Sequence, residues 1–420
     1  MYTRISQCRI CGSSSVPAVL DLGTQALTGV FPRAGTEVAS GPLQLVKCSQ
    51  CDLVQLAHNY DLSLLYGDNY GYRSGLNASM VRHLQEKVRR IQGLAKPRAG
   101  DLVVDIGSND GTLLRSYDVA GLERVGIDPS GPKFKKYYPA DVRLIPEFFS
   151  GRVLQAAYPA RKAKVITSIA MFYDLEDPQA FVNEIARVLD GQGVWVFEQS
   201  YLPAMLSANA YDTVCHEHLE YYAMKQIELL LRRAGLKVVD VEFNAVNGGS
   251  FSVTAAHANA SLPAAERAVK EVLERESRDG IYHIDTYARF AATVEKHKRT
   301  LLDLLRELKA AGKQVFGYGA STKGNVVIQY CGIGPDEIPC IAEVNEDKFG
   351  AYTPGSRIPI VSEAQARAKR PEYMLVFPWH FRDFIVEKEQ PYLRAGGSLI
   401  FPLPEVQVVS ADGVRSFGRG

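Results

Sequence analysis

The densest group of titratable side chains in the sequence lies between Asp212 and Tyr222, which reads Asp-Thr-Val-Cys-His-Glu-His-Leu-Glu-Tyr-Tyr. Two of the eight histidines, His216 and His218, flank Glu217 there. Histidine is the side chain whose ordinary pKa lies nearest neutrality, so this pattern indicates a general base. In a strand the two imidazoles would share one face, and in a helix they would diverge by about 200°. A metal site with a third acidic ligand from this segment, or structural histidines in a turn, are the alternatives.

Four of the seven cysteines form two pairs, Cys8 with Cys11 and Cys48 with Cys51, separated by 36 residues. Each Cys-x-x-Cys turn places two thiolates on one side of the chain, and two such turns can complete a tetrahedron around Zn²⁺. Four thiolates leave no open coordination position, so we predict a structural zinc site and not a catalytic one. A redox pair or unliganded buried thiols are the alternatives.

A glycine turn follows a buried strand in the sequence Val-Val-Asp105-Ile-Gly107-Ser-Asn109-Asp-Gly111. The glycines let the backbone approach a ligand closely, although the turn lacks the full G-x-G-x-x-G spacing. Its carboxylates suit a cationic ligand better than a pyrophosphate. The next strand ends at Asp128, where an acid can bind two ribose hydroxyls. We therefore predict a nucleoside-type ligand here, and the alternative is a tight turn with no ligand.

A second turn, Gly-Tyr-Gly-Ala-Ser321-Thr-Lys323-Gly-Asn325, follows a short apolar run. Glycines, hydroxyls and a lysine at an expected helix N-terminus suit a phosphate, although a structural turn between strand and helix is the alternative. A weaker signal begins at Asn247, where Asn-Gly-Gly-Ser could simply link two strands.

Alternating strands and helices must position these residues. A helical pattern from Ser79 is followed by apolar runs that alternate with helix-like segments, which is typical of a parallel sheet buried on both faces. A charged helical connector follows over 263–311, and the alternation then restarts. The predicted strands are 102–106, 124–127, 164–169 and 193–197 in the first unit, and 314–318, 338–343, 373–377 and 398–401 in the second. We therefore expect an α/β protein in three parts, 1–75, 76–260 and 261–420.

Composition and charge restrict the partners. The 420 residues are 46% hydrophobic and 23% charged, which excludes collagen-like, disordered and coiled-coil classes. A net charge of +1 argues against nucleic acid or an anionic membrane as a partner. No apolar run approaches the roughly 20 residues of a membrane span, and the first residues lack the apolar core of a signal peptide. We expect a cytoplasmic protein that is a monomer or a weak homo-oligomer.

In this order, the cysteine pairs, the Asp-Ile-Gly-Ser-Asn-Asp-Gly turn, the Cys-His-Glu-His-Leu-Glu-Tyr-Tyr segment, Asn-Gly-Gly-Ser and the second glycine turn resemble the S-adenosylmethionine-dependent sugar C-methyltransferases. These enzymes act on nucleotide-linked 4-keto-6-deoxy sugars. The resemblance implies a zinc-binding module, a class I methyltransferase domain with a Rossmann-like fold, and a C-terminal Rossmann-like α/β domain. It also implies S-adenosylmethionine and a structural zinc ion as cofactors.

The resemblance also implies roles for particular residues. His218 would be the base, with Glu217 and His216 beside it, and Tyr70 and Tyr72 match an active-site tyrosine region. The residues expected to bind cofactor are Asp105, Gly107, Asn109, Gly111 and Asp128, and those expected to bind substrate are Tyr222, Asn247, Ser321, Lys323 and Asn325. The second glycine turn would lie near the substrate's diphosphate.

Two positions depart from the family pattern. Many members have a tyrosine where this chain has Cys215, and an arginine where it has Ser252. Tyr70, Tyr72, Tyr221 or Tyr222 could take over the role of the missing tyrosine. We expect methylation at C3″ of a dTDP- or GDP-linked 4-keto-6-deoxy sugar through an enolate. The alternatives are an O- or N-methyltransferase of another small molecule, or a zinc protein that binds or modifies RNA.

Overall fold

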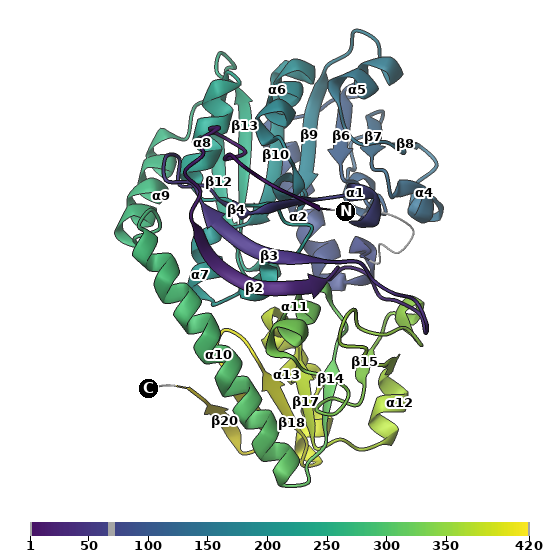
Figure 1. Cartoon of the computed structure of the whole chain (residues 1–420). Coiled ribbons are helices and arrows are strands. Elements are labelled where there is room, and N and C mark those ends of the chain that lie inside the picture. The colour runs from purple at the N-terminus through teal and green to yellow at the C-terminus, as the bar shows by residue number, and fades with distance from the viewer. Residues whose placement is uncertain (1, 66–71, 419–420) are drawn as a thin grey trace.

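The computed structural model describes residues 2–65 and 72–418, and these residues form an N-terminal module, a central domain and a C-terminal domain (Figure 1). The N-terminal module is a four-stranded antiparallel sheet in the order β11-β4-β3-β2. Its strands are β2 (Ala18–Ala26), β3 (Ser40–Lys47), β4 (Val54–Leu56) and β11 (Glu220–Tyr221). A strand pair, β1 (Tyr2–Arg4) with β5 (His58–Tyr60), and helix α1 (Leu62–Leu65) complete it. Because β11 comes directly after the histidines, the module and the central domain share a sheet.

The central domain is a seven-stranded sheet in the order β12-β13-β10-β9-β6-β7-β8. Six of the seven strands run in the same direction, and β13 runs antiparallel to both of its neighbours, β10 and β12. The strands are β6 (Leu102–Ile106), β7 (Glu123–Ile127), β8 (Val142–Ile145), β9 (Ala163–Ile169), β10 (Leu189–Ser200), β12 (Leu236–Asn244) and β13 (Ser250–His257). All five residues of β6 are buried, as expected for a strand covered on both faces.

The helices of the central domain cover both faces of this sheet. They are α2 (Ala78–Ala95), α3 (Thr112–Arg115), α4 (Gly131–Phe134), α5 (Gly151–Ala157), α6 (Pro178–Val188), α7 (Leu202–Ser207) and α8 (Met224–Arg233). Local signals set their ends: the Asn77 side chain accepts a hydrogen bond from the Ser79 N–H at the start of α2, and Asp177 does the same for Ala180 at the start of α6.

The C-terminal domain has a second seven-stranded sheet, in the order β16-β15-β14-β17-β18-β19-β20. Its strands are β14 (Val315–Tyr318), β15 (Ile341–Glu343), β16 (Ile360–Ser362), β17 (Tyr373–Val376), β18 (Ser398–Phe401), β19 (Gln407–Ser410) and β20 (Gly413–Ser416). Its helices are α11 (Thr322–Cys331), α12 (Glu363–Ala368), α13 (Arg382–Lys388) and α14 (Gln390–Arg394). The first five strands are parallel, and β14 lies between β15 and β17. In both domains the first strand therefore lies at the point where the strand order reverses, which is where open α/β sheets bind ligands.

Two helices form the connector that the sequence predicts over 263–311. They are α9 (Glu266–Arg278) and α10 (Ile284–Ala310), and α10 runs along one side of the molecule down to the C-terminal sheet (Figure 1). Leu301, Leu304, Leu305 and Leu308 of α10 are buried in the same core as strands of the C-terminal domain. The connector is thus packed against the domains along its apolar stripe.

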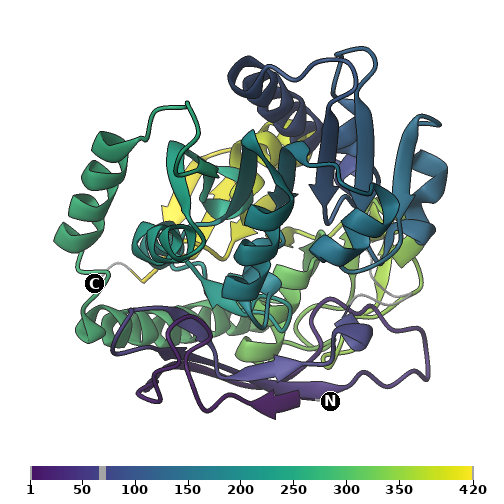
Figure 2. The ribbon, with the colours of Figure 1, turned by 90° about the horizontal axis from the view of Figure 1, so that it is seen from above.

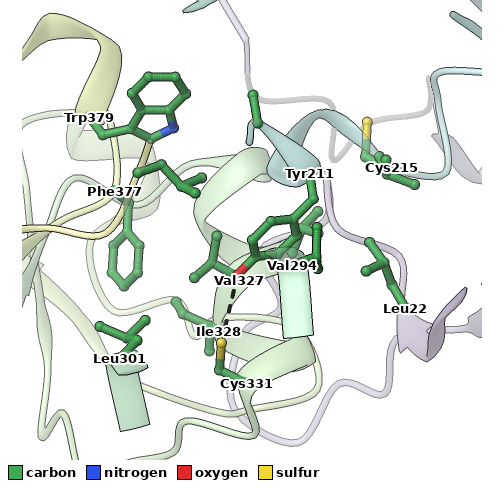
Figure 3. Packing of buried hydrophobic residues seen from close by; sticks show 14 of the residues in the cluster. Leu22, Tyr211, Cys215, Val294, Leu301, Val327, Ile328, Cys331, Phe377 and Trp379 are labelled. Atoms are coloured by element: carbon green, nitrogen blue, oxygen red, sulfur yellow. Dashed lines mark hydrogen bonds between the residues drawn. The ribbon is translucent and has the colours of Figure 1, made fainter. Parts of the chain in front are cut away.

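One hydrophobic core joins all three parts. It includes Leu22 of β2, Tyr211, Val294 of α10 and Phe377. The Tyr211 hydroxyl hydrogen-bonds with the Cys331 sulfur of α11 over 3.7 Å, so the central domain reaches directly into the C-terminal core (Figure 3). Seen from above, the N-terminal sheet lies along one side of the molecule (Figure 2). None of the helices in the described ranges is both long and apolar enough to cross a bilayer.

Candidate active site

The first glycine turn lies where the strand order of the central sheet reverses. It connects β6 to α3, and Gly107 (φ 69°), Asn109 (φ 49°) and Gly111 (φ 73°) all have left-handed backbone conformations. A Cβ at Gly111 would approach the Tyr138 ring to 3.2 Å. Tyr138, which the sequence analysis did not single out, also hydrogen-bonds through its hydroxyl to the Ser108 hydroxyl at 2.8 Å. The turn therefore requires glycine for both conformation and space.

Asp105, the last but one residue of β6, is a buried carboxylate suited to a cation. Its Oδ1 accepts a hydrogen bond from the Thr167 hydroxyl at 2.6 Å. Burial raises the pKa of the Asp105 carboxyl to about 7. Oδ2 has no hydrogen-bond partner among the described residues, so a positively charged group at this oxygen would stabilise the ionised form.

Asp128, directly after β7, ties the turn to the next strand. Its Oδ2 accepts from the Asn109 N–H at 2.7 Å, and its Oδ1 accepts from the N–H and hydroxyl of Ser130 at 2.7 and 2.6 Å. A carboxylate has about four acceptor positions, so these three bonds leave one for a ribose hydroxyl. The carboxylate thus shapes the turn, and its remaining acceptor position suits a hydroxyl donor.

A segment from the N-terminal side covers the glycine turn. The Ser74 N–H donates to Asn109 Oδ1 at 2.9 Å, the Gly75 N–H donates to Asp110 Oδ2 at 2.9 Å, and Asn109 Nδ2 donates to the Tyr72 carbonyl at 3.1 Å. Tyr72 is 50% exposed as a whole residue, but burial, with a smaller effect from the charge of Asp110, raises the pKa of its hydroxyl, so the structure brings both its backbone and its hydroxyl to the glycine turn. Tyr70 lies outside the described residues.

A buried charged group fixes α2 beside this turn. Glu198, at the carboxyl end of β10, accepts from His83 at 2.6 Å and contacts Lys87 at 3.0 Å. Burial raises the pKa of Glu198, but the hydrogen bond from His83 and the charge of Lys87 outweigh it, so the net shift is downward. No sequence pattern predicted this group, because Glu198 lies more than 100 residues after His83 and Lys87.

The His-Glu-His segment is a turn between the 3-10 helix η4 (Tyr211–Thr213) and β11, and not a strand or a helix. His218 Nδ1–H donates to the Thr213 carbonyl at 2.9 Å, and its ring lies 4.2 Å from the Tyr173 ring. Because a carbonyl only accepts, the proton of the neutral ring is on Nδ1 and Nε2 carries the lone pair. Nε2 has no hydrogen-bond partner among the described residues, so it can receive a proton.

Burial, with a smaller effect from the charge of Lys323, lowers the pKa of His218 to about 4. His218 is therefore neutral at pH 7, which is the form a general base needs. Glu217 precedes His218 in the chain. Its Oε1 lies so close to Gly29 that a Cβ on residue 29 would collide with this oxygen. The other oxygen, Oε2, is buried and has no hydrogen-bond partner in the described part of the chain, and burial raises the pKa of this carboxyl.

His216 points the other way, into the N-terminal module. Its Nε2–H donates to the Gly41 carbonyl at 3.3 Å, and its Nδ1 accepts from the Thr28 hydroxyl at 3.5 Å. The side chain is 0% exposed, stacks edge-on against Tyr60, and burial lowers its pKa to about 4. Both ring nitrogens are thus engaged in holding two parts of the fold together.

Tyr222 lies in the core of the central domain. Its ring stacks on Phe172 with the ring centroids 5.3 Å apart, it is 0% exposed, and its hydroxyl has no hydrogen-bond partner within residues 2–65 and 72–418. It belongs to the same core as the zinc-site cysteines, whereas the core around Cys215 is a different one. Tyr222 is thus a core side chain of the central domain.

The second glycine turn connects β14 to α11 where the strand order of the C-terminal sheet reverses. Ser321 is the N-cap of α11, since its hydroxyl accepts from the Gly324 N–H at 3.0 Å. Asn325 is 1% exposed, and its Nδ2 donates to the Thr28 carbonyl of the N-terminal module at 2.8 Å. A Cβ at Gly324 would lie 2.7 Å from Phe377, so glycine allows the close packing of α11 against β17. Ser321 thus caps α11, and Asn325 ties α11 to the N-terminal module.

The side chain of Lys323 extends from this turn towards the central domain. Its Nζ donates to the Asn247 carbonyl at 2.6 Å, so the structure brings together these two predicted substrate-binding residues. The neighbouring Gly248 packs against Trp379, and Trp379 Nε1–H donates to Asp212 Oδ2 at 2.7 Å. Trp379 is buried and connects the two domains through this hydrogen bond.

The four paired cysteines meet in one cluster. Their sulfurs all lie within 4.8 Å of one another, with Cys8 to Cys51 at 3.5 Å and Cys11 to Cys48 at 3.4 Å. A tetrahedron with Zn–S bonds of about 2.3 Å has sulfurs about 3.8 Å apart, so the cluster fits zinc. The Gln50 and Cys51 N–H groups point at the Cys48 sulfur, at 3.4 and 3.5 Å. Four thiolates complete the coordination, which makes the site structural.

The strand order of the central sheet, its glycine turn and the acid after β7 define a class I methyltransferase domain, whose cofactor is S-adenosylmethionine. Residues 77–241 match the methyltransferase domain family, residues 8–66 a zinc-binding domain family, and residues 245–404 the C-methyltransferase C-terminal domain family. C-methyltransferase NovU of Streptomyces niveus is 34% identical over 414 residues, covering 97% of this chain and 98% of NovU. The chain belongs to this family of S-adenosylmethionine-dependent C-methyltransferases.

Solved structures resemble part of the chain. An S-adenosylmethionine-dependent methyltransferase from Clostridium acetobutylicum is 12% identical, with 42% of this chain and 92% of that chain covered and a TM-score of 0.32. The N-methyltransferase NodS from Bradyrhizobium japonicum is 13% identical, with 43% and 97% covered and a TM-score of 0.31.

Proposed function

We propose that the protein methylates C3″ of a nucleotide-linked 4-keto-6-deoxy sugar, through an enolate formed by His218. The observation that carries this proposal is the state of His218. Its Nδ1–H is held by the Thr213 carbonyl, its Nε2 has no hydrogen-bond partner among the described residues, and its pKa is lowered to about 4. A neutral base with a fixed orientation suits removal of a proton from carbon, which methylation of an oxygen or nitrogen does not require.

The chemistry of the proton transfer follows from this geometry. A ketone at C4″ acidifies the proton on C3″, and His218 Nε2 accepts that proton. The C–H electron pair forms a C3″–C4″ double bond, and the carbonyl electrons move to the C4″ oxygen. General-base catalysis contributes about 10²–10⁴-fold to a rate. When bound, S-adenosylmethionine supplies the electrophilic methyl group. The Thr213 carbonyl keeps the proton of the neutral ring on Nδ1 and still accepts that hydrogen bond in the imidazolium that the transfer forms.

Two features of the site support a sugar nucleotide as the substrate. The N-terminus of α11 presents the backbone N–H groups of Thr322 and Lys323, which have no acceptor among the described residues, and such a helix terminus suits a diphosphate. Asp212 and Glu217 each have a buried carboxylate oxygen that finds no hydrogen-bond donor in the residues the structure describes, and sugar hydroxyls are donors that would satisfy these oxygens. The proposed substrate is a dTDP- or GDP-linked sugar that spans the two domains.

The experiment is methyl transfer from S-adenosylmethionine labelled with ¹³C in its methyl group. The purified protein is incubated with dTDP- and GDP-linked 4-keto-6-deoxy sugars, and the product is analysed by NMR. We expect a methyl group bonded to C3″ with one of these substrates. The same nucleotides carrying the unoxidised 4-hydroxy sugar are the control and should give no product. Labelled methyl on oxygen, or on C3″ of the 4-hydroxy sugar, would contradict the proposal.

A further inference from the structure

The side chain of Lys323 points away from the second glycine turn, where the residue itself lies. It is in the first turn of α11, where a phosphate ligand would be expected. Its Nζ instead donates to the Asn247 carbonyl of the central domain at 2.6 Å. An ammonium group has three N–H donors, and the other two have no hydrogen-bond acceptor among the described residues. These donors are available to a ligand on the side of the central domain.

The 3-10 helix η4 anchors both Lys323 and the proposed base. Its residue Thr213 accepts the hydrogen bond from His218 Nδ1 at 2.9 Å. Its residue Asp212 lies in the electrostatic field of Lys323, and Trp379 fixes the Asp212 carboxylate through a hydrogen bond of 2.7 Å. Consecutive residues thus fix the base and balance the charge of the ammonium, and η4 itself packs against α11. Lys323 and His218 therefore face the same space.

The charges in this space act on each other. The charge of Lys323 adds to burial in lowering the pKa of His218, so it helps to keep the imidazole neutral. Burial lowers the pKa of Lys323 itself, while Asp212 and Cys215 act in the opposite direction. A cation near a base disfavours protonation of the base in the free enzyme. The same cation stabilises an anion on the substrate, so one positive charge would favour both a neutral base and an enolate.

We propose that Lys323 Nζ donates a hydrogen bond to the C4″ oxygen of the sugar, stabilising the enolate, and that Lys323 is not a ligand of the diphosphate. This inference rests on the proposed function. As the C3″ proton moves to His218 Nε2, negative charge moves to the C4″ oxygen, where the ammonium meets it. When the new C–C bond forms, the ketone returns and the hydrogen bond weakens. Lys323 is thus a catalytic residue, and the diphosphate is held by the backbone N–H groups at the start of α11.

The two roles of Lys323 predict opposite behaviour of Lys323→Met. Loss of an oxyanion donor lowers a rate by about 10²–10³-fold. Loss of a phosphate ligand instead weakens binding of the nucleotide diphosphate. We therefore propose to measure the exchange of the C3″ hydrogen for deuterium in D₂O at saturating substrate, and the Kd of dTDP and GDP by calorimetry. Lys323→Gln, which keeps a neutral donor, is the second variant, and S-adenosylmethionine binding shows that each variant is folded.

We expect Lys323→Met to exchange at least about 100-fold more slowly than the wild type, with a nucleotide Kd within threefold of the wild-type value. The exchange rate of Lys323→Gln should lie between the rates of the wild type and of Lys323→Met. The acidic limb of the rate profile should also move to higher pH in Lys323→Met, because the pKa of His218 rises when the cation is removed. A tenfold or larger rise in the nucleotide Kd, or exchange at the wild-type rate, would overturn the inference. If the wild-type protein itself exchanges no C3″ hydrogen, the proposed function fails instead.

Discussion

His216 and His218 lie two residues apart and should respond in opposite ways to the same replacement. In His216→Asn the shorter side chain no longer reaches the Gly41 carbonyl, which His216 Nε2–H contacts at 3.3 Å. A buried carbonyl without a partner costs about 1–3 kcal/mol, and lost packing against Tyr60 adds to this. We expect a destabilisation of about 2–4 kcal/mol. In His218→Asn the amide can still donate to the Thr213 carbonyl, so we expect a loss of less than about 1 kcal/mol.

The order of the two variants should be reversed for catalysis, with His218→Asn affected more strongly than His216→Asn. His218→Asn removes the lone pair of Nε2, so methyl transfer should fall by about 10²–10⁴-fold or more. His216→Asn should keep most of its activity at a temperature where it is folded. Urea denaturation followed by circular dichroism gives the free energies of unfolding, and transfer of a radiolabelled methyl group gives the rates. The reasoning is refuted if His218→Asn is destabilised as strongly as His216→Asn, or if His216→Asn is stable and inactive.

Three further results are expected. Cys48→Ser should reduce zinc, measured by metal analysis, from about one ion per chain to a small fraction, and should lower the Tm; a variant that retains zinc and stability would contradict the structural site. His216 is neutral in the fold, with its pKa lowered from 6.5 to about 4, so stability is full above pH 6.5 and falls as the pH drops towards 4. Between pH 7 and pH 5, His216 should account for about 2 kcal/mol of that loss, measured by urea denaturation, and a His216→Asn variant with the wild-type pH dependence would refute this. Asp128→Ala should raise the Kd of S-adenosylmethionine about tenfold or more while leaving that of dTDP unchanged, because its remaining acceptor position suits a ribose hydroxyl; equal binding by calorimetry would remove Asp128 from the cofactor site.

Local sequence patterns predicted the features that depend on neighbouring residues. The strand over 102–106 has the predicted bounds, because a continuous apolar run before a glycine turn has few other conformations available. The zinc site was also predictable, since each Cys-x-x-Cys turn already places two thiolates together. The predicted family and both cofactors are confirmed by the match to C-methyltransferases over nearly the whole chain.

Contacts between residues far apart in the chain determine the features of the site that the sequence did not predict. Spacing alone did not show that His216 and His218 would differ, because the difference comes from Gly41 and Thr28, about 180 residues away in the N-terminal module. Neither a strand nor a helix describes the segment, since the sheet formed by β11 and β4 fixes it as a turn. The direction of Lys323 depends on the Asn247 carbonyl in another domain, so no pattern around the second glycine turn contained it. The sequence therefore identified the segments of the site, and tertiary packing determined which of their side chains face the site and which hold the fold together.

The most direct test of the central claim is hydrogen exchange at C3″ of the keto sugar in D₂O, with S-adenosylhomocysteine in place of the methyl donor. This isolates proton removal from methyl transfer. If His218 is the base, the wild-type protein should exchange the C3″ hydrogen, and His218→Asn should slow this exchange by about 10²-fold or more while binding dTDP or GDP equally well. Exchange by His218→Asn at the wild-type rate, or methyl transfer by the wild type to C3″ without any proton removal, would contradict the account.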